Sequence, residues 1–209
     1  MWNWRALRQP PPGCNSGEQR IQHAMMTHDE VLTLLRSTDL VGIGFRADAF
    51  RKQLHPEPVI SYALNTGGNR LLGEVENETA KLELTPQSTS EDRLSLLEDL
   101  RRQQEATGRF LCFTVMPHGD VTASEYMKVL AAARLYLDNI PHAQIPVASM
   151  DTKLAQVAIR FGANDLGIVN LDNKGDRNAV TEEQVRRLIR DAGLTPKQRD
   201  SSFRTYFLY

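Results

Sequence analysis

The sequence predicts an α/β protein in which a parallel sheet is covered by helices. Apolar runs of strand length alternate with amphipathic helical stretches at least three times in the second half of the chain. This alternation is typical of β/α units. At several expected helix starts, threonine stands three residues before glutamate or glutamine, and such a pair caps the first turn. Glycine or proline follows most of the expected helix ends.

The composition describes one globular domain and argues against two classes of partner. The 209 residues are 41% hydrophobic and 24% charged, which suits one packed core but not two full domains. Lys and Arg number 25 and Asp and Glu number 26, so no net field attracts nucleic acid or an anionic membrane. No apolar run is long enough to span a bilayer, and the first residues lack the apolar core of a secretory signal. We expect a cytoplasmic protein without nucleic-acid or membrane partners.

The two cysteines predict neither a disulfide framework nor a thiolate metal site. Cys14 and Cys112 are too few and too far apart in the sequence for either. We therefore expect two reduced thiols and no bound metal.

The first part of the chain predicts an unstructured head and a small helical unit. Residues 1–26 contain three consecutive prolines and no hydrophobic period, so we expect a disordered head. Residues 67–88 are expected to be a junction. Between them, residues 27–66 are expected to hold, in order, a helix that opens at Thr27, a helix over 46–55 and a strand over 59–65.

The second part, residues 89–209, predicts alternating helices and strands. Leucine or other apolar side chains recur at helical spacing in the expected helices, and the expected strands are compact apolar runs. The helices are expected over 90–107, 122–139, 151–162 and 181–192, and the strands over 110–115, 143–149 and 165–171.

Four strings in this second part occur in an order that points to a known family. They are TSEDRLSLLEDLRRQQEATGRF (Thr89–Phe110), ARLYLDNIPH (Ala133–His142), KLAQVAIRFGANDLG (Lys153–Gly167) and EEQVRRLIRDAGLTPKQRD (Glu182–Asp200). Together they resemble the C-terminal part of the radical-SAM enzymes aminofutalosine synthase, dehypoxanthine futalosine cyclase and the synthase of a deazaflavin precursor. With lower specificity, Leu34–Asn65 resembles the N-terminal segment of the same family.

The resemblance implies a TIM barrel with a 4Fe–4S cluster and S-adenosylmethionine, and the sequence departs from the family at both features. In the family, a Cys-x-x-x-Cys-x-x-Cys motif follows the N-terminal strand, and its three thiolates bind the cluster. This chain has no cysteine between Cys14 and Cys112. A complete barrel takes about 250 residues. We therefore expect an incomplete, TIM-barrel-like parallel sheet with covering helices, and neither the cluster nor S-adenosylmethionine.

Other positions that the resemblance ties to the family's site are also changed. The family has Gly-His-x-Glu-Thr, which resembles an S-adenosylmethionine contact, where this chain has Thr85–Thr89, and only the threonine persists. The tryptophan expected after LDNIPH falls on Val147, and the acidic pair expected after FGANDLG falls near Asp172 and Asn173. The packing strings persist while these positions differ.

Five residues are candidates for binding a ligand, and each has a plain structural interpretation. Two flank the turn after a helix, two open a strand, and one follows a strand in a loop, where such side chains usually serve the backbone or solvent. A TIM barrel places its chemistry at the carboxyl ends of strands, which weakens a catalytic role for the first four. The candidates are Asn139, His142, Asn164, Asp165 and His118. None is assigned a catalytic or metal-binding role.

Three functions of different classes remain open. The favoured one is a non-catalytic, degenerate paralogue that is associated by resemblance with futalosine-pathway menaquinone biosynthesis. The second is a binder or enzyme that accepts a futalosine-like or purine nucleoside ligand without S-adenosylmethionine. The third is a non-functional gene remnant. A partial barrel exposes unpaired strand edges, so the expected protein partner is a second copy of the chain or a full-length paralogue.

Overall fold

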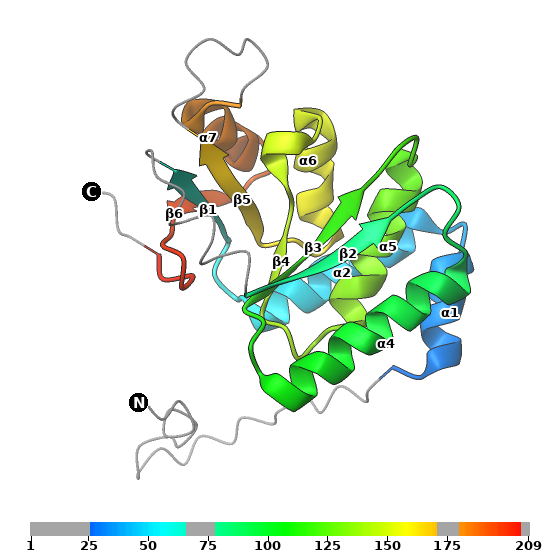
Figure 1. Ribbon diagram of the computed structural model, residues 1–209. Coiled ribbons are helices and arrows are strands. Elements are labelled where there is room, and N and C mark those ends of the chain that lie inside the picture. Colours follow the sequence, from blue (N-terminus) through cyan, green and yellow to red (C-terminus); the bar gives the residue numbers. More distant parts are fainter. Residues whose placement is uncertain (1–25, 66–77, 171–179, 206–209) are drawn as a thin grey trace.

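The computed structural model describes residues 26–65, 78–170 and 180–205 (Figure 1). Within them, parallel strands form one sheet in the order β2-β3-β4-β5-β1-β6. The first strand along the chain therefore lies between two of the last. The strands are β1 (Val59–Asn65), β2 (Thr79–Leu84), β3 (Cys112–Pro117), β4 (His142–Gln144), β5 (Asp165–Asn170) and β6 (Thr195–Gln198).

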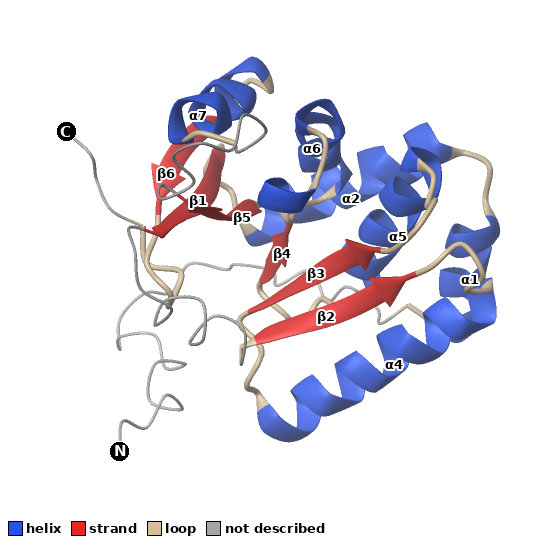
Figure 2. Ribbon diagram, turned by 45° about the horizontal axis from the view of Figure 1, so that its top comes forward, coloured by secondary structure: helices blue, strands red, loops and turns tan. Residues whose placement is uncertain are grey.

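Helices connect the strands and pack against the sheet. In Figures 1 and 2, α4 and α5 lie beside β2 and β3, and α7 lies beside β1, β5 and β6. The helices are α1 (His28–Arg36), α2 (Leu40–Leu54), α4 (Ser90–Thr107), α5 (Ala123–Tyr136), α6 (Thr152–Ala158) and α7 (Glu182–Asp191), with short 3-10 helices η2 (Val147–Ser149) and η3 (Ile159–Phe161).

The two faces of the sheet differ in polarity. Along β2, Leu82 and Leu84 are fully buried in the helix-covered core, whereas Lys81 and Glu83, which alternate with them, are exposed. Side chains alternate between faces along a strand, so the second face of β2 is polar. The helix-covered face carries the hydrophobic core, and the polar face corresponds to the inside of a barrel.

The sheet is open rather than closed. Within the described residues, the outer edges of β2 and β6 pair with no further strand. In a (β/α)8 barrel, the first strand pairs with a strand from the end of the chain. The same kind of pairing occurs here between β1 and β5, although the sheet does not close. The architecture is therefore a partial TIM-barrel-like sheet, and the predicted fold class is confirmed.

Most predicted elements are confirmed, and the capping signals are the most accurate. Capping boxes are formed at the starts of α1, α5 and α7 by Thr27, Thr122 and Thr181, as the spacing predicts. α4 coincides with the predicted range 90–107 and ends at Gly108, whose φ of 62° is left-handed. A glycine adopts this conformation without a side-chain clash.

Several predictions about elements need correction. α2 begins at Leu40, because Asp39 caps it by accepting a hydrogen bond from the amide of Gly42, so the helix predicted over 46–55 is longer than expected. The strand predicted over 143–149 ends at Gln144, because Pro146 interrupts it and a 3-10 helix follows. β2 lies inside the segment predicted to be a junction, and β6 was not predicted. The predicted disordered head lies outside the described residues, except for Met26.

No helix in the described ranges is long and apolar enough to cross a membrane.

Candidate functional site

Three of the five candidate residues meet at the amino ends of the central strands. His142 and Asp165 are the first residues of β4 and β5, and Asn164 precedes Asp165. We call these three residues, together with Ser61 of β1 and Arg199 after β6, the basal cluster. The cluster joins segments that are far apart in sequence, since Ser61 and Asp165 are 104 positions apart.

A fully buried ion pair forms the centre of the basal cluster. Arg199 donates two hydrogen bonds to the Asp165 carboxylate, from Nε to Oδ2 and from Nη2 to Oδ1, the latter at 2.8 Å. Both side chains have 0% exposure. Ser61 Oγ donates to Asp165 Oδ2 at 2.6 Å, and the Gly167 amide donates to Asp165 Oδ1 at 2.8 Å. The carboxylate is thus fully paired, as a buried charge requires.

His142 lies beside this ion pair in a stack of three rings. Its ring centroid is 5.1 Å from that of His55 and 4.2 Å from that of Phe203. The guanidinium of Arg199 lies 3.9 Å from the centre of the Phe203 ring, which is a cation–π contact. The stack thereby links the end of α2, the start of β4 and the segment after β6.

The hydrogen bonds of Asn164 fix the protonation state of His142. Asn164 Oδ1 accepts the amide of Ala143 at 2.8 Å, so the Nδ2 group of Asn164 faces His142 Nδ1, also at 2.8 Å. A nitrogen that accepts a hydrogen bond carries no proton. Burial, with His55 and Arg199 adding positive field, lowers the pKa of His142 to about 4. The imidazole is therefore neutral at pH 7.

A groove of about 270 Å³ opens next to the basal cluster. It lies at the amino ends of the strands, opposite to the end where barrel enzymes carry out chemistry. Its polar groups are already engaged: Ser61 donates to a carboxylate that Arg199 neutralises, and Nδ1 of His142 is occupied. The Asp165 carboxylate that accepts the Ser61 hydrogen bond is itself held by Arg199 in the buried ion pair. The cluster thereby joins β1, β5 and the segment after β6.

The other two candidates lie away from the basal cluster. Asn139 Nδ2 donates to the carbonyl of Arg101 at 3.3 Å, and its own carbonyl accepts from Gln104, so it joins the turn after α5 to α4. His118 follows β3 at the carboxyl end of the sheet, and its imidazole contacts the carboxylate of Glu83 of β2 at the surface. The structure therefore does not assemble the five candidates into one site.

Sequence reasoning missed four residues that surround His142 and Asp165. His55, Ser61, Arg199 and Phe203 come from segments distant in the chain, and no local pattern marks them. One signal was present for Arg199, which lies in the string EEQVRRLIRDAGLTPKQRD that carries the resemblance.

The residues present do not fit a 4Fe–4S cluster. Such a cluster needs three converging thiolates, and the whole sequence has two cysteines. Cys112 is buried on β3 and contacts Thr79 and Gln144. Burial raises the pKa of the Cys112 thiol to about 12, so it stays protonated. Among the described residues, no group of three or more His, Cys, Asp or Glu side chains converges in a way that could hold a metal ion.

The open parallel sheet with its covering helices is that of a partial β/α-barrel protein. A buried ion pair between Asp165 and Arg199 joins its strands. Comparison with protein-family models makes this specific, because the model of the "CofH/MqnC C-terminal region" matches residues 106–207. The match lies in the C-terminal part of the chain and covers just under half of its length.

Curated relatives agree with the family. Aminodeoxyfutalosine synthase of Thermus thermophilus is 33% identical over 137 residues, which are 56% of this chain and 37% of that protein. Cyclic dehypoxanthine futalosine synthase of Streptomyces coelicolor is 26% identical over 211 residues, covering 90% of this chain and 53% of that protein. A 5-amino-6-(D-ribitylamino)uracil–L-tyrosine 4-hydroxyphenyl transferase of Methanopyrus kandleri is 31% identical over 140 residues, covering 56% and 38%. The chain spans about a third to a half of the length of these relatives.

Proposed function

We propose that this chain is a non-catalytic member of its family, associated with the futalosine pathway through its relatives. The observation that carries the proposal is the number and state of the cysteines. The sequence has two, Cys14 and Cys112, and Cys112 is buried and protonated. Without three thiolate ligands the 4Fe–4S cluster is not bound, and without the cluster S-adenosylmethionine is not reductively cleaved. On this proposal the 209 residues carry the scaffold and not the radical chemistry.

The distribution of retained residues supports the proposal. The strings that resemble the family contain residues of the basal cluster, such as Asp165 and Arg199, which join the start of β5 to the segment after β6. The altered positions, Thr85–Ser88 and Val147, follow β2 and β4 at the carboxyl end, where a barrel enzyme holds its substrate. The residues that stabilise the sheet are kept, and those tied to the family's site differ.

Anaerobic reconstitution tests the proposal. The protein is incubated with ferrous iron, sulfide and reductant, beside a family member that carries the cysteine motif. We expect no brown cluster, no reduced-cluster signal in electron paramagnetic resonance and no 5′-deoxyadenosine from S-adenosylmethionine. Cluster formation with release of 5′-deoxyadenosine would contradict the proposal. A Cys112→Ser variant identifies iron that is bound adventitiously through the described thiol.

A nucleoside ligand stays a prediction that a separate measurement tests. Calorimetric titration with adenosine and inosine at the protein's working temperature measures binding without reference to the cluster. A saturable heat would favour the alternative of a nucleoside binder, whereas no heat would remove it.

A further inference from the structure

The segment after β6 forms a tight turn next to the basal cluster. Asp200 organises it, because Asp200 Oδ1 accepts the amides of Ser202 and Arg204, both at 2.9 Å. Asp200 Oδ2 accepts Arg204 Nε at 2.7 Å. We call residues 200–204 the Phe203 turn. These bonds lie within the turn, so they hold its shape whether or not it touches the basal cluster.

Phe203 joins the turn to the basal cluster in a backbone conformation that is unfavourable for this residue. Its φ of 59° is left-handed, and among the residues that the structure describes, no other residue besides glycine has a positive φ. A bulky side chain keeps such a conformation only where its surroundings hold it. Here they are the His142 imidazole, 4.2 Å away and tilted by only 8°, and the Arg199 guanidinium, 3.9 Å away.

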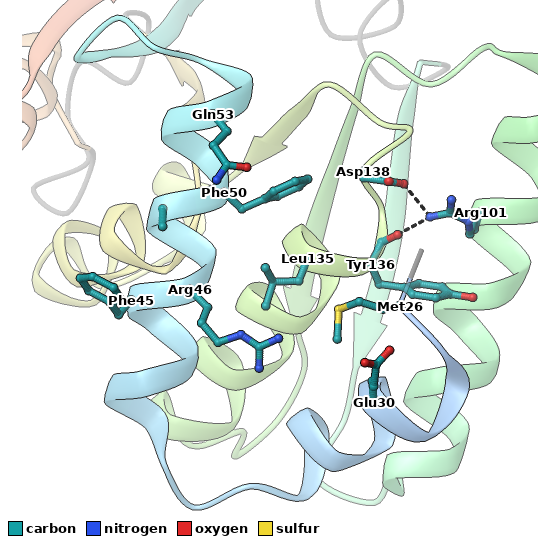
Figure 3. Close-up of a pocket in the computed structure, with 11 residues that line it drawn as sticks. Met26, Glu30, Phe45, Arg46, Phe50, Gln53, Arg101, Leu135, Tyr136 and Asp138 are labelled. Atoms are coloured by element: carbon teal, nitrogen blue, oxygen red, sulfur yellow. Dashed lines mark hydrogen bonds and ion pairs between the residues drawn. The ribbon is translucent and has the colours of Figure 1, made fainter. Parts of the chain in front are cut away.

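The turn covers the buried ion pair and one wall of the basal groove. Phe203 lines that groove together with His142 and Ser61. The Arg199 side chain that Phe203 contacts has 0% exposure. A larger groove of about 370 Å³, between α1, α2 and the end of α5, shares no residue with the basal groove (Figure 3). Release of Phe203 therefore opens the basal groove and leaves the larger one as it is.

The contact between Phe203 and His142 depends on a neutral imidazole. Asn164 Oδ1 accepts the Ala143 amide, so the Nδ2 group of Asn164 is turned toward His142 Nδ1. A proton on Nδ1 would set an N–H donor against the N–H donors of Asn164 and break this hydrogen bond. The imidazole that supports the Phe203 ring would then lose the partner that orients it.

The charged groups around the stacked rings also oppose a proton. Asp165 is paired with Arg199. Glu57 is paired with Lys197 at 3.1 Å. Burial and these surroundings lower the pKa of His55 and that of His142, the latter to about 4. A cation on the Phe203 ring is attracted to it, but Arg199 already lies against that ring. The charged groups that face the two imidazoles from the packed elements are Arg51, Glu57, Arg134, Asp165, Lys197 and Arg199.

We propose that the Phe203 turn is a latch that acid opens: protonation of His142 releases Phe203, and the turn moves away from Arg199 and the basal groove. In the open form His142 is hydrated and binds a proton with ordinary affinity. The open form therefore gains on the closed form by up to about 300-fold as the pH falls from 6.5 to below 4. The unfavourable φ of Phe203 keeps the advantage of the closed form at pH 7 small enough to be reversed. The inference does not depend on the proposed function.

Nuclear magnetic resonance of the full chain tests the latch. We expect the amide signals of residues 200–204 to shift together as the pH is lowered from 7 to 4.5, while those of β2 and β3 stay in place. His142→Gln keeps an oxygen that can accept from Asn164 but takes up no proton, so the shift of the turn should be lost. The matched control is His118→Gln, at the carboxyl end of the sheet, which should leave the shift unchanged.

A variant of the latch itself separates local opening from loss of folding. Phe203→Ala should leave the turn open at pH 7, so that its signals no longer shift with pH. The proton affinity of His142, measured from its ring signals, should rise by about tenfold or more because the ring is hydrated. Phe203→Tyr keeps the stacked ring and should behave as the wild-type protein. Turn signals that shift only when those of β2 and β3 shift, a His142→Gln turn that still shifts, or a Phe203→Ala protein with unchanged His142 affinity each overturns the proposal.

Discussion

At the scale of single residues, the stability of the fold depends on the buried Asp165–Arg199 ion pair. Each charge is stable in the interior only because the other is present, since both side chains have 0% exposure. Ser61 and the Gly167 amide complete the carboxylate's hydrogen bonds. Losing one member is therefore worse than losing both.

Replacing Arg199 tests this pair. We expect Arg199→Met to lower the free energy of unfolding by about 3–5 kcal/mol, because it leaves Asp165 charged and unpaired. Urea denaturation followed by circular dichroism measures the loss. Arg187→Met is the matched control, because Arg187 is 80% exposed and pairs with Asp191 at the surface. The double variant Arg199→Met with Asp165→Leu should be more stable than Arg199→Met alone, and a less stable double variant would contradict this account.

His142 makes stability depend on pH. Burial lowers its pKa from 6.5 to about 4 in the folded protein. Below pH 6.5 the unfolded chain therefore binds a proton that the folded protein does not, and stability falls as the pH drops toward 4. The loss contributed by this residue is at most about 3 kcal/mol.

Unfolding free energies at pH 7 and pH 4.5 measure this contribution. We expect His142→Gln to show a smaller loss over this interval than the wild-type protein. Equal pH dependence in the wild-type protein and His142→Gln would show that another group is responsible.

At the scale of elements, the sequence predicted the helix starts that depend on hydrogen bonds between residues close together in the chain. Four helices begin with a threonine whose hydroxyl accepts an amide hydrogen bond from the third helical residue. Such pairs are visible in the sequence because both partners lie within one turn. The strands β2 and β6 were missed for different reasons. The alternation of charged and apolar residues in β2 is the pattern of a half-buried strand, but the segment was assigned to a junction. The signal of β6 is weak, because it is a four-residue strand that contains Pro196.

The cap of α4 gives a prediction at this scale. Thr89→Ala removes a hydroxyl that accepts the Asp92 amide at 3.1 Å and leaves the capping box incomplete. We expect a loss of about 1 kcal/mol in unfolding free energy. Ser95→Ala is the control, since Ser95 is exposed on the same helix and caps nothing. A loss in Ser95→Ala equal to that in Thr89→Ala would indicate a general effect of substitution on α4.

At the scale of the whole molecule, the sequence predicted the class of sheet and that it is incomplete, but not how its ends are joined. Alternating helices and strands imply a parallel sheet without specifying where β1 lies in it. That position depends on the pairing of β1 with β5 and β6, and on contacts such as Ser61 with Asp165 across 104 positions. For the same reason, only His142, Asn164 and Asp165 of the basal cluster were predicted, because Ser61 and Arg199 acquire their roles from a neighbour that is remote in the chain.

The strand order also has a consequence for how the protein is made. β1 is synthesised early, yet within the described residues its partners are β5 and β6. A nascent chain therefore carries the segment VISYALN without a partner strand until β5 (Asp165–Asn170) has left the ribosome. Such distant pairing slows folding and leaves sticky intermediates. Ser61 and its partner Asp165 are 104 positions apart, so β1 stays unpaired while that whole stretch is synthesised, a period in which a chaperone has the most to protect.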